Sequence, residues 1–141
     1  MKRSTLRKIE KQFERWPDMR AEGASEAMIE EAKQALGCTF DKQYREFLTR
    51  YGSGRVGPDP IFGVFPAPDL GKDWSVVDMT RTFRRQGWPG VDDWYVISVD
   101  GQGNPVGMDS RGRVRISDHD VGDQAMLART FEKYLLHLLS L

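Results

Sequence analysis

The sequence predicts an α+β fold in a single domain, residues 1–141, because its hydrophobic pattern changes period twice. Up to residue 51, apolar residues recur every three or four positions, the spacing of helices that pack against a core. From residue 94 they alternate or fill both faces of a short run, as strands do, and a helical spacing returns before the C-terminus. We therefore expect N-terminal helices, a central and mostly antiparallel sheet that ends in a three-strand meander, and a C-terminal helix, with no linker or repeat dividing the chain.

Three helices are predicted in the first third of the chain. Residues 3–16 form an amphipathic helix that Pro17 ends, since proline cannot continue a helix. Its core-facing residues are Leu6, Ile9, Phe13 and Trp16. A second helix follows the N-cap Ser25 and ends at Gly37, and a third begins after Asp41. The core-facing residues of these two helices are Met28, Ile29, Ala32, Leu36, Tyr44, Phe47, Leu48 and Tyr51.

The middle of the chain is rich in residues that break helices. Glycine and proline are dense over residues 52–72, which predicts loops, interrupted by one short strand at 61–65. A helix is expected over residues 74–86 because apolar and small side chains recur there at helical spacing. These side chains are Trp74, Val77, Thr80 and Phe83.

The three-strand meander is predicted after residue 94. Residues 94–99 are apolar on both faces, as in a central strand. Turn sequences at 100–104 and 109–112 join this strand to two more, which lie around residues 106–108 and 114–117. A final helix is expected over about residues 121–140. Its apolar residues are Met126, Leu127, Phe131, Tyr134, Leu135, Leu138 and Leu139.

Composition excludes several classes of protein. The 21 basic and 21 acidic residues cancel, whereas a general nucleic-acid binder usually carries a basic excess, so no direct nucleic-acid binding is expected. No apolar run is long enough to span a membrane, and the first ten residues lack the apolar stretch of a signal peptide. The single cysteine, Cys38, forms no internal disulfide, which fits a reducing cytoplasm, and we expect a cytoplasmic protein.

No set of residues predicts a catalytic, cofactor-binding or metal site. Gly101-Gln102-Gly103 lies between two strands, which favours a hairpin turn over a phosphate loop. Asp118-His119-Asp120 suggests a carboxylate that orients an imidazole, but adjacent side chains point apart, and a metal needs three or four convergent ligands. Structural or interface roles are favoured for these residues and for Cys38. An enzyme or ligand-binding domain that uses Asp118, His119 and Cys38 remains a third hypothesis.

The distribution of charge is more informative than its sum. Residues 1–20 carry seven basic and three acidic side chains, whereas residues 92–123 carry seven aspartates and three arginines. Aspartate is common in turns, which is one explanation of the second segment. The other is an acidic surface that meets a basic partner and accelerates their encounter. The candidate partner-binding residues are Asp92, Asp93, Asp100, Asp118, His119, Asp120 and Asp123.

A series of short segments occurs in an order that is typical of one family. These are Ile29–Ala32 with Leu36-Gly37, Phe40–Leu48 with Tyr51-Gly52, Ile61–Gly63, Asp100–Asn104, Gly112–Val114, Asp118–Asp120, and the helix with Phe131, Leu135 and Leu138. Together they resemble the SUKH superfamily, in the branch named for a fungal cell-wall assembly regulator. The resemblance covers about residues 25–139 and leaves residues 1–20 as an added amphipathic helix.

The resemblance implies a non-enzymatic α+β domain without a cofactor. Compact bacterial members of the superfamily are commonly immunity proteins, and the leading hypothesis is that this chain binds and neutralises a cognate polymorphic toxin. The toxin would be a nuclease whose basic groove the acidic residues cover. The alternative is a regulatory or scaffold module with an endogenous protein partner and no toxin. The resemblance leaves the partner's identity and the oligomeric state open.

Overall fold

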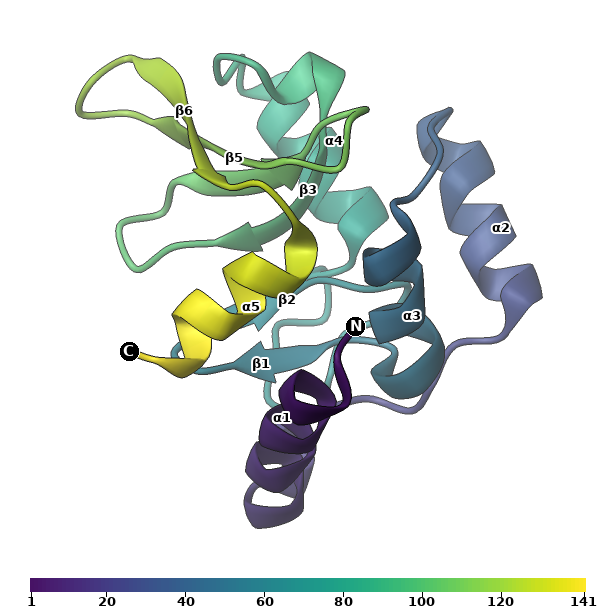
Figure 1. The fold of residues 1–141 in the computed structure, drawn as a ribbon. Coiled ribbons are helices and arrows are strands. Elements are labelled where there is room, and N and C mark those ends of the chain that lie inside the picture. Colours follow the sequence, from purple (N-terminus) through teal and green to yellow (C-terminus); the bar gives the residue numbers. More distant parts are fainter.

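The computed structural model describes residues 1–141 and has the predicted α+β fold (Figure 1). The α-helices are α1 (Arg3–Arg15), α2 (Glu26–Leu36), α3 (Lys42–Tyr51), α4 (Val76–Arg85) and α5 (Phe131–Leu139), with short 3-10 helices η1 (Pro17–Met19) and η2 (Val91–Asp93). The strands are β1 (Gly54–Val56), β2 (Asp59–Ile61), β3 (Tyr95–Val99), β4 (Pro105–Met108), β5 (Val114–Asp118) and β6 (Asp123–Ala128).

The strands form two antiparallel sheets. β1 and β2 make a hairpin, and β3, β4, β5 and β6 pair in sequence order as a four-strand meander. In Figure 1, α5 lies in front of the sheets, α4 is next to β3, and α1 to α3 surround the lower and right-hand sides. The β3 side of the large sheet is covered, because α4 packs there and the Phe62 amide donates to the Ile97 carbonyl at 2.7 Å. The β6 side has no strand beside it.

An aromatic cluster joins α3, α5 and β3 in the core. The Phe131 ring of α5 meets the rings of Tyr44 and Phe47 edge to face, with centroids 5.5 and 5.7 Å apart. Tyr95 of β3 packs against Tyr44 at 5.4 Å, and the buried Tyr44 hydroxyl donates to the Phe62 carbonyl. Such contacts add to the burial of the rings themselves, so this cluster fixes how the helices meet the sheet.

The predicted ends of α2 and the predicted start of α3 are confirmed. The Ser25 hydroxyl accepts from the Met28 amide at the start of α2, and the Asp41 carboxylate accepts from the amides of Gln43 and Tyr44 at the start of α3. Each cap satisfies amides that have no partner inside the helix. Gly37 ends α2 with a φ of 64°, a left-handed conformation that glycine adopts at low cost.

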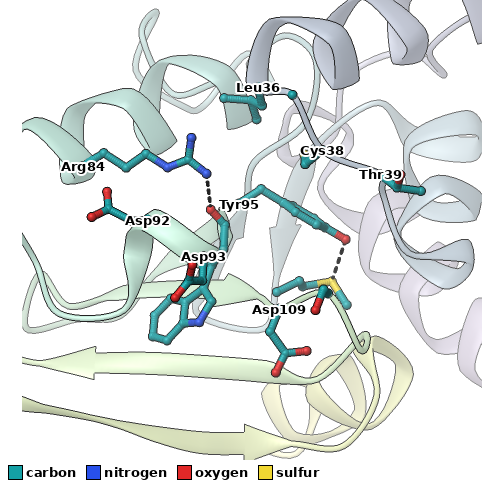
Figure 2. A pocket seen from close by; sticks show the side chains of 12 residues that line it. Leu36, Cys38, Thr39, Arg84, Asp92, Asp93, Tyr95 and Asp109 are labelled. Carbon is teal, nitrogen blue, oxygen red and sulfur yellow. Dashed lines mark hydrogen bonds between the residues drawn. The ribbon is translucent and has the colours of Figure 1, made fainter.

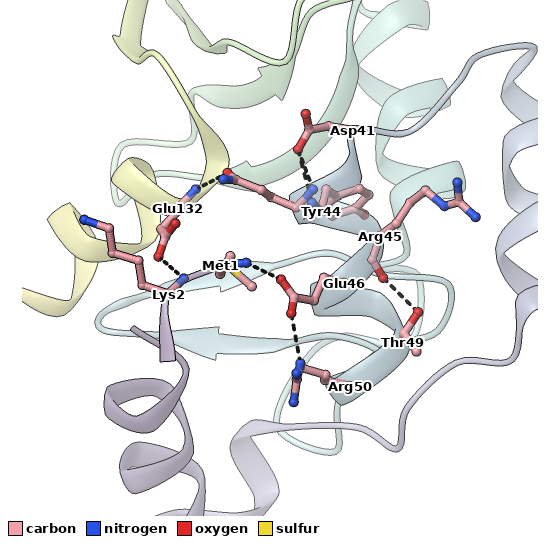
Figure 3. Close-up of polar contacts among 10 residues, drawn as sticks. Met1, Lys2, Asp41, Tyr44, Arg45, Glu46, Thr49, Arg50 and Glu132 are labelled. Carbon is pink, nitrogen blue, oxygen red and sulfur yellow. Dashed lines mark hydrogen bonds and ion pairs between the residues drawn. The ribbon is translucent and has the colours of Figure 1, made fainter. Parts of the chain in front are cut away.

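The N-terminal helix is attached to the rest of the chain by polar contacts as well as by its apolar face (Figure 3). The Lys2 amide donates to the Glu132 carboxylate at 2.7 Å, and the Glu132 amide donates to the Gln43 side chain at 2.9 Å. These two bonds join the starts of α1, α3 and α5. Gln12 donates to the Arg55 carbonyl at 3.0 Å and so connects α1 to β1.

The predicted helix over residues 121–140 is wrong in its first half. Residues 123–128 form β6, and α5 begins only at Phe131. Gly122 has a φ of 68° and closes a hairpin turn, while Thr130 is extended and its hydroxyl caps α5 by accepting from the Lys133 amide. Met126 and Leu127 are spaced from the apolar residues of α5 like residues on one face of a longer helix, but they lie exposed on a strand. The meander therefore has four strands instead of three.

Three smaller predictions are also wrong. The strand expected at 61–65 lies at Asp59–Ile61, where it pairs with β1 in a hairpin that the glycines and prolines concealed. Trp16 and Met28 were expected to face the core, but about half of each side chain is exposed. Both lie at an end of a helix, where the apolar stripe leaves the protein interior.

Candidate functional site

Five of the seven candidate residues gather at one end of the four-stranded sheet. In an antiparallel meander the β3–β4 turn and the β5–β6 turn lie at the same end. Asp100 begins the first turn, and the others belong to the second or flank it. We call these residues the acidic end: Asp100, Asp118, His119, Asp120 and Asp123.

The two turns of the acidic end are joined through a side chain that the sequence did not identify. Asn104 is 1% exposed, its amide nitrogen donates to the Asp100 carboxylate at 3.1 Å, and its side-chain oxygen accepts from the His119 backbone amide at 3.0 Å. His119 Nδ1 also faces this oxygen, and His119 Nε2 lies 3.2 Å from Asp120. A chain of polar contacts therefore runs from Asp100 through Asn104 and His119 to Asp120.

The carboxylates of the acidic end carry charge that no lysine or arginine neutralises. The Asp100 carboxylate accepts hydrogen bonds from amides of its own turn, and the Asp118 carboxylate accepts one from the Asp120 amide. Stabilisation of the turns is therefore one reason why aspartate stands at these two positions. Asp120 and Asp123 are exposed, and the only ion-pair partner in the group is His119. The acidic end therefore presents a negative surface toward solvent.

Asp59 extends this surface from the neighbouring hairpin. It lies at the start of β2, which packs beside β3, and its pKa is raised above the ordinary value by burial and, secondly, by the charge of Asp100. The sequence did not single out Asp59, because it lies between Pro58 and Pro60 in a segment that predicts loops. Only the pairing of distant segments places it beside Asp100.

We expect Asp59→Asn to stabilise the protein at neutral pH. Because the pKa of Asp59 is higher in the folded than in the unfolded state, the folded state binds more protons at pH values between the two pKa values. The free energy of unfolding therefore falls as pH rises through this interval. Above it the substitution removes the cost of a partly buried carboxylate, whereas the gain shrinks as pH falls through 3.8, because the carboxyl then becomes neutral in the unfolded state as well. Thermal unfolding at pH 7 and pH 3.5 measures the difference. Asp73→Asn, at an exposed site, should change neither value.

Asp92 and Asp93 lie apart from the other candidates. They belong to η2, ahead of β3, and line a pocket with Asp109 and Ser110 of the β4–β5 turn, at the opposite end of the sheet (Figure 2). The pocket has a volume of about 480 Å³ and is closed on its other side by residues 36–39. The candidate aspartates therefore do not form one continuous surface: the sheet separates two acidic clusters.

The Arg84 side chain binds backbone carbonyls beside the pocket and forms no ion pair with the carboxylates that line it. Its guanidinium donates to the carbonyls of Val91 and Trp94 at 3.1 and 2.7 Å. Neither Asp92 nor Asp93 has a hydrogen-bonding or ion-pair partner for its carboxylate, and both are exposed. These two carboxylates are thus available to a basic group from outside the chain.

The residues of the enzyme hypothesis are not assembled. Cys38 lines the pocket, whereas Asp118 and His119 belong to the acidic end. The pKa of the Cys38 thiol is raised by burial, which opposes formation of the nucleophilic thiolate. No group of three or more His, Cys, Asp or Glu side chains is placed to hold a metal ion.

Tryptophan side chains often anchor protein interfaces, but in this chain Trp88 is half-buried and Trp94 is buried. Trp94 is 3% exposed and belongs to the core, as its position in an apolar run favours. Trp88 is half-buried, and its ring contacts those of Phe83 and His119 edge to face at 5.7 and 5.9 Å. Trp88 therefore supports the acidic end from beneath and is not a free anchor.

Comparison with known proteins identifies a family for this chain. A search of curated proteins gives no match. None of the helices combines the length and the apolar character needed to cross a membrane. The family profile described as SMI1 / KNR4 family (SUKH-1) matches residues 23–137, from the segment before α2 to the last turns of α5, and leaves α1 outside. The chain therefore belongs to the SMI1 / KNR4 family (SUKH-1), a family of generally non-enzymatic immunity and interaction proteins.

Proposed function

We propose that this chain is an immunity protein that neutralises a cognate toxin by covering its active site, and that the toxin is a nuclease. The family supports the general class, because SUKH proteins are commonly immunity proteins. The observation that carries the proposal for this chain is the acidic end, where carboxylates from two turns meet without a lysine or arginine partner.

The electrostatics of this surface suit such a target. A nuclease needs a basic groove to hold the phosphates of its substrate. Exposed carboxylates on a rigid turn present the same sign of charge as phosphate, so they compete for the groove and accelerate association. Asn104 and Trp88 keep the turns in place before the partner arrives, which lowers the entropic cost of binding.

Asp92 and Asp93 supply a second acidic contact in this proposal. The five residues of β3 separate the two clusters by about 17 Å at the rise of a strand. A standard interface of about 800 Å² on each partner is wide enough to include both. One basic partner can therefore contact the acidic end and the rim of the pocket together.

Toxin rescue tests the proposal directly. A tagged pull-down from the native host, at low and moderate salt, identifies the partner, and co-expression of the chain should then restore growth to cells that make that partner. If only housekeeping or envelope-assembly proteins are recovered and no partner is toxic, the chain is a regulatory or scaffold module instead.

The acidic end predicts the kinetics of that complex. We expect the double variant Asp120→Lys/Asp123→Lys to lower the association rate at low salt by about tenfold or more, because steering by opposite charges changes such rates by 10- to 1,000-fold. Stopped-flow mixing or surface plasmon resonance measures the rate. Asp73→Lys changes the charge at an exposed aspartate outside both clusters and should have a smaller effect. An unchanged rate and salt dependence in the double variant would contradict the electrostatic part of the proposal.

A further inference from the structure

β6 is an open edge of the large sheet. It pairs with β5 on one side and with nothing on the other, so its outward amides and carbonyls have no strand partner. Residues 123–127 are all exposed. Sheet edges in soluble proteins are commonly protected by lysine, proline or a bulge. Residues 123–128 contain no lysine or proline, and the irregularity in their pairing is a register shift against β5 at Leu127.

Exposed apolar side chains are concentrated at this edge. Six large hydrophobic side chains of the chain are exposed, and three of them, Val121, Met126 and Leu127, lie on β6 or on the turn before it. Met126 and Leu127 are each 46% exposed, although both are large enough to stabilise an interface when buried. Apolar side chains beside an unpaired backbone are what an added strand covers.

The charges along β6 favour a second copy of β6 as the strand that is added. The N-terminal end carries Asp120 and Asp123, and the residue after the strand, Arg129, is exposed and forms no ion pair within the chain. A second copy of the strand, running antiparallel about a twofold axis near Ala125 and Met126, places its Arg129 beside the Asp120–Asp123 end of the first. The twofold axis produces this opposite-charge contact twice.

We propose that two copies of this chain pair through β6 and form a continuous eight-stranded antiparallel sheet. The edge is complementary to itself: acidic at one end, apolar in the middle and basic at the other. Registers that bring Asp123 of one copy opposite Asp123 of the other are disfavoured by like-charge repulsion. Since a short strand pair buries less than a standard interface, the dimer is weak and depends on concentration. Because it uses Asp120 and Asp123, it competes with a basic partner for that part of the acidic end.

Analytical ultracentrifugation of the purified protein tests this without any toxin. Between about 5 and 500 µM, a range that covers weak dimers, we expect the dimer fraction to rise with concentration. Met126→Lys places two lysines near the twofold axis and should raise the dissociation constant at least about tenfold, with circular dichroism confirming that the fold is kept. Met28→Lys alters a methionine of equal exposure on α2 and should leave the dimer intact.

Charge exchange tests the orientation of the strands. Arg129→Asp alone should weaken the dimer, and Asp123→Arg combined with Arg129→Asp should restore it, because the opposite charges meet again in reversed order. A monomer at every concentration overturns the proposal. So does a dimer that Met126→Lys leaves unchanged, a dimer that Met28→Lys abolishes, or a double variant as weak as Arg129→Asp.

Discussion

Gly63→Ala is expected to unfold the protein, or to lower its free energy of unfolding by more than about 4 kcal/mol. A Cβ atom at residue 63 would lie 1.6 Å from the carbonyl oxygen of Gly52 and 2.9 Å from the Cβ of Ser53. The nearest clash is with backbone, so no change of side-chain rotamer relieves it. Because domains of this size are stable by only about 5–15 kcal/mol, separating the two segments removes much of that margin.

Urea denaturation followed by circular dichroism measures the loss. Gly101→Ala is the matched control, since it is the same substitution at a glycine in an exposed turn, with no atom within 4 Å of the added carbon. It should change the free energy of unfolding by no more than about 0.5 kcal/mol. A loss below about 1 kcal/mol for Gly63→Ala would mean that the two segments are not packed as closely as the structure has them.

The close approach at Gly63 is a consequence of topology. The Gly63 carbonyl accepts from the Val76 amide at 2.8 Å, and the preceding residue, Phe62, donates to Ile97 of β3. The chain therefore passes between the end of α3, the start of α4 and the edge of the sheet. The sequence shows a glycine at position 63, but it does not show which backbone lies against it. That backbone belongs to Gly52, eleven positions earlier in the chain.

Features set by local chemistry were predicted correctly. The caps of α2 and α3 depend on Ser25 and Asp41 and on amides two or three residues away. The turn after β3 depends on Asp100, which accepts bonds from amides two and four residues later. Because these interactions lie within a few positions of the chain, residue type and order suffice to predict them.

Features that need a distant partner were missed. β6 is stable as a strand because β5 pairs with it, whereas Met126 and Leu127 taken alone have the spacing of a helix face. The β1–β2 hairpin is short and contains Pro60, so it has no strand pattern of its own. In both segments tertiary pairing overrides the local pattern.

The residues of the candidate site also fall into two groups, those whose place follows from the order of the strands and those placed by contacts between distant segments. Antiparallel order alone brings Asp100 and the residues around the β5–β6 turn to one end of the sheet, so this part of the acidic surface could be inferred from turn positions. Asp92 and Asp93 precede β3 and therefore lie at the other end. Asp59 joins the acidic end through the effect of the Asp100 charge on its pKa, and Asn104 through hydrogen bonds to Asp100 and His119. No sequence signal sets either apart from ordinary turn residues.

Asn104 gives the second large prediction, because it is the buried connection between the two turns. Asn104→Ala should lower the free energy of unfolding by about 2–3 kcal/mol, since it removes two hydrogen bonds and leaves the His119 amide without its partner. Hydrogen exchange should quicken in both turns. Gln102→Ala, at an exposed position of the same turn, should cost no more than about 0.5 kcal/mol.

Asn104→Asp separates the role of the hydrogen bonds from that of shape. The new carboxyl has nearly the volume of the amide and still accepts from the His119 amide, but an oxygen replaces the nitrogen that donates to Asp100. Two carboxylates at that distance repel, so the folded state binds a proton more tightly than the unfolded state, and stability falls as pH rises from about 4 to 7. A loss in Asn104→Asp that does not vary with pH would mean that Asn104 acts by packing alone, and the acidic end would then not depend on its hydrogen bonds.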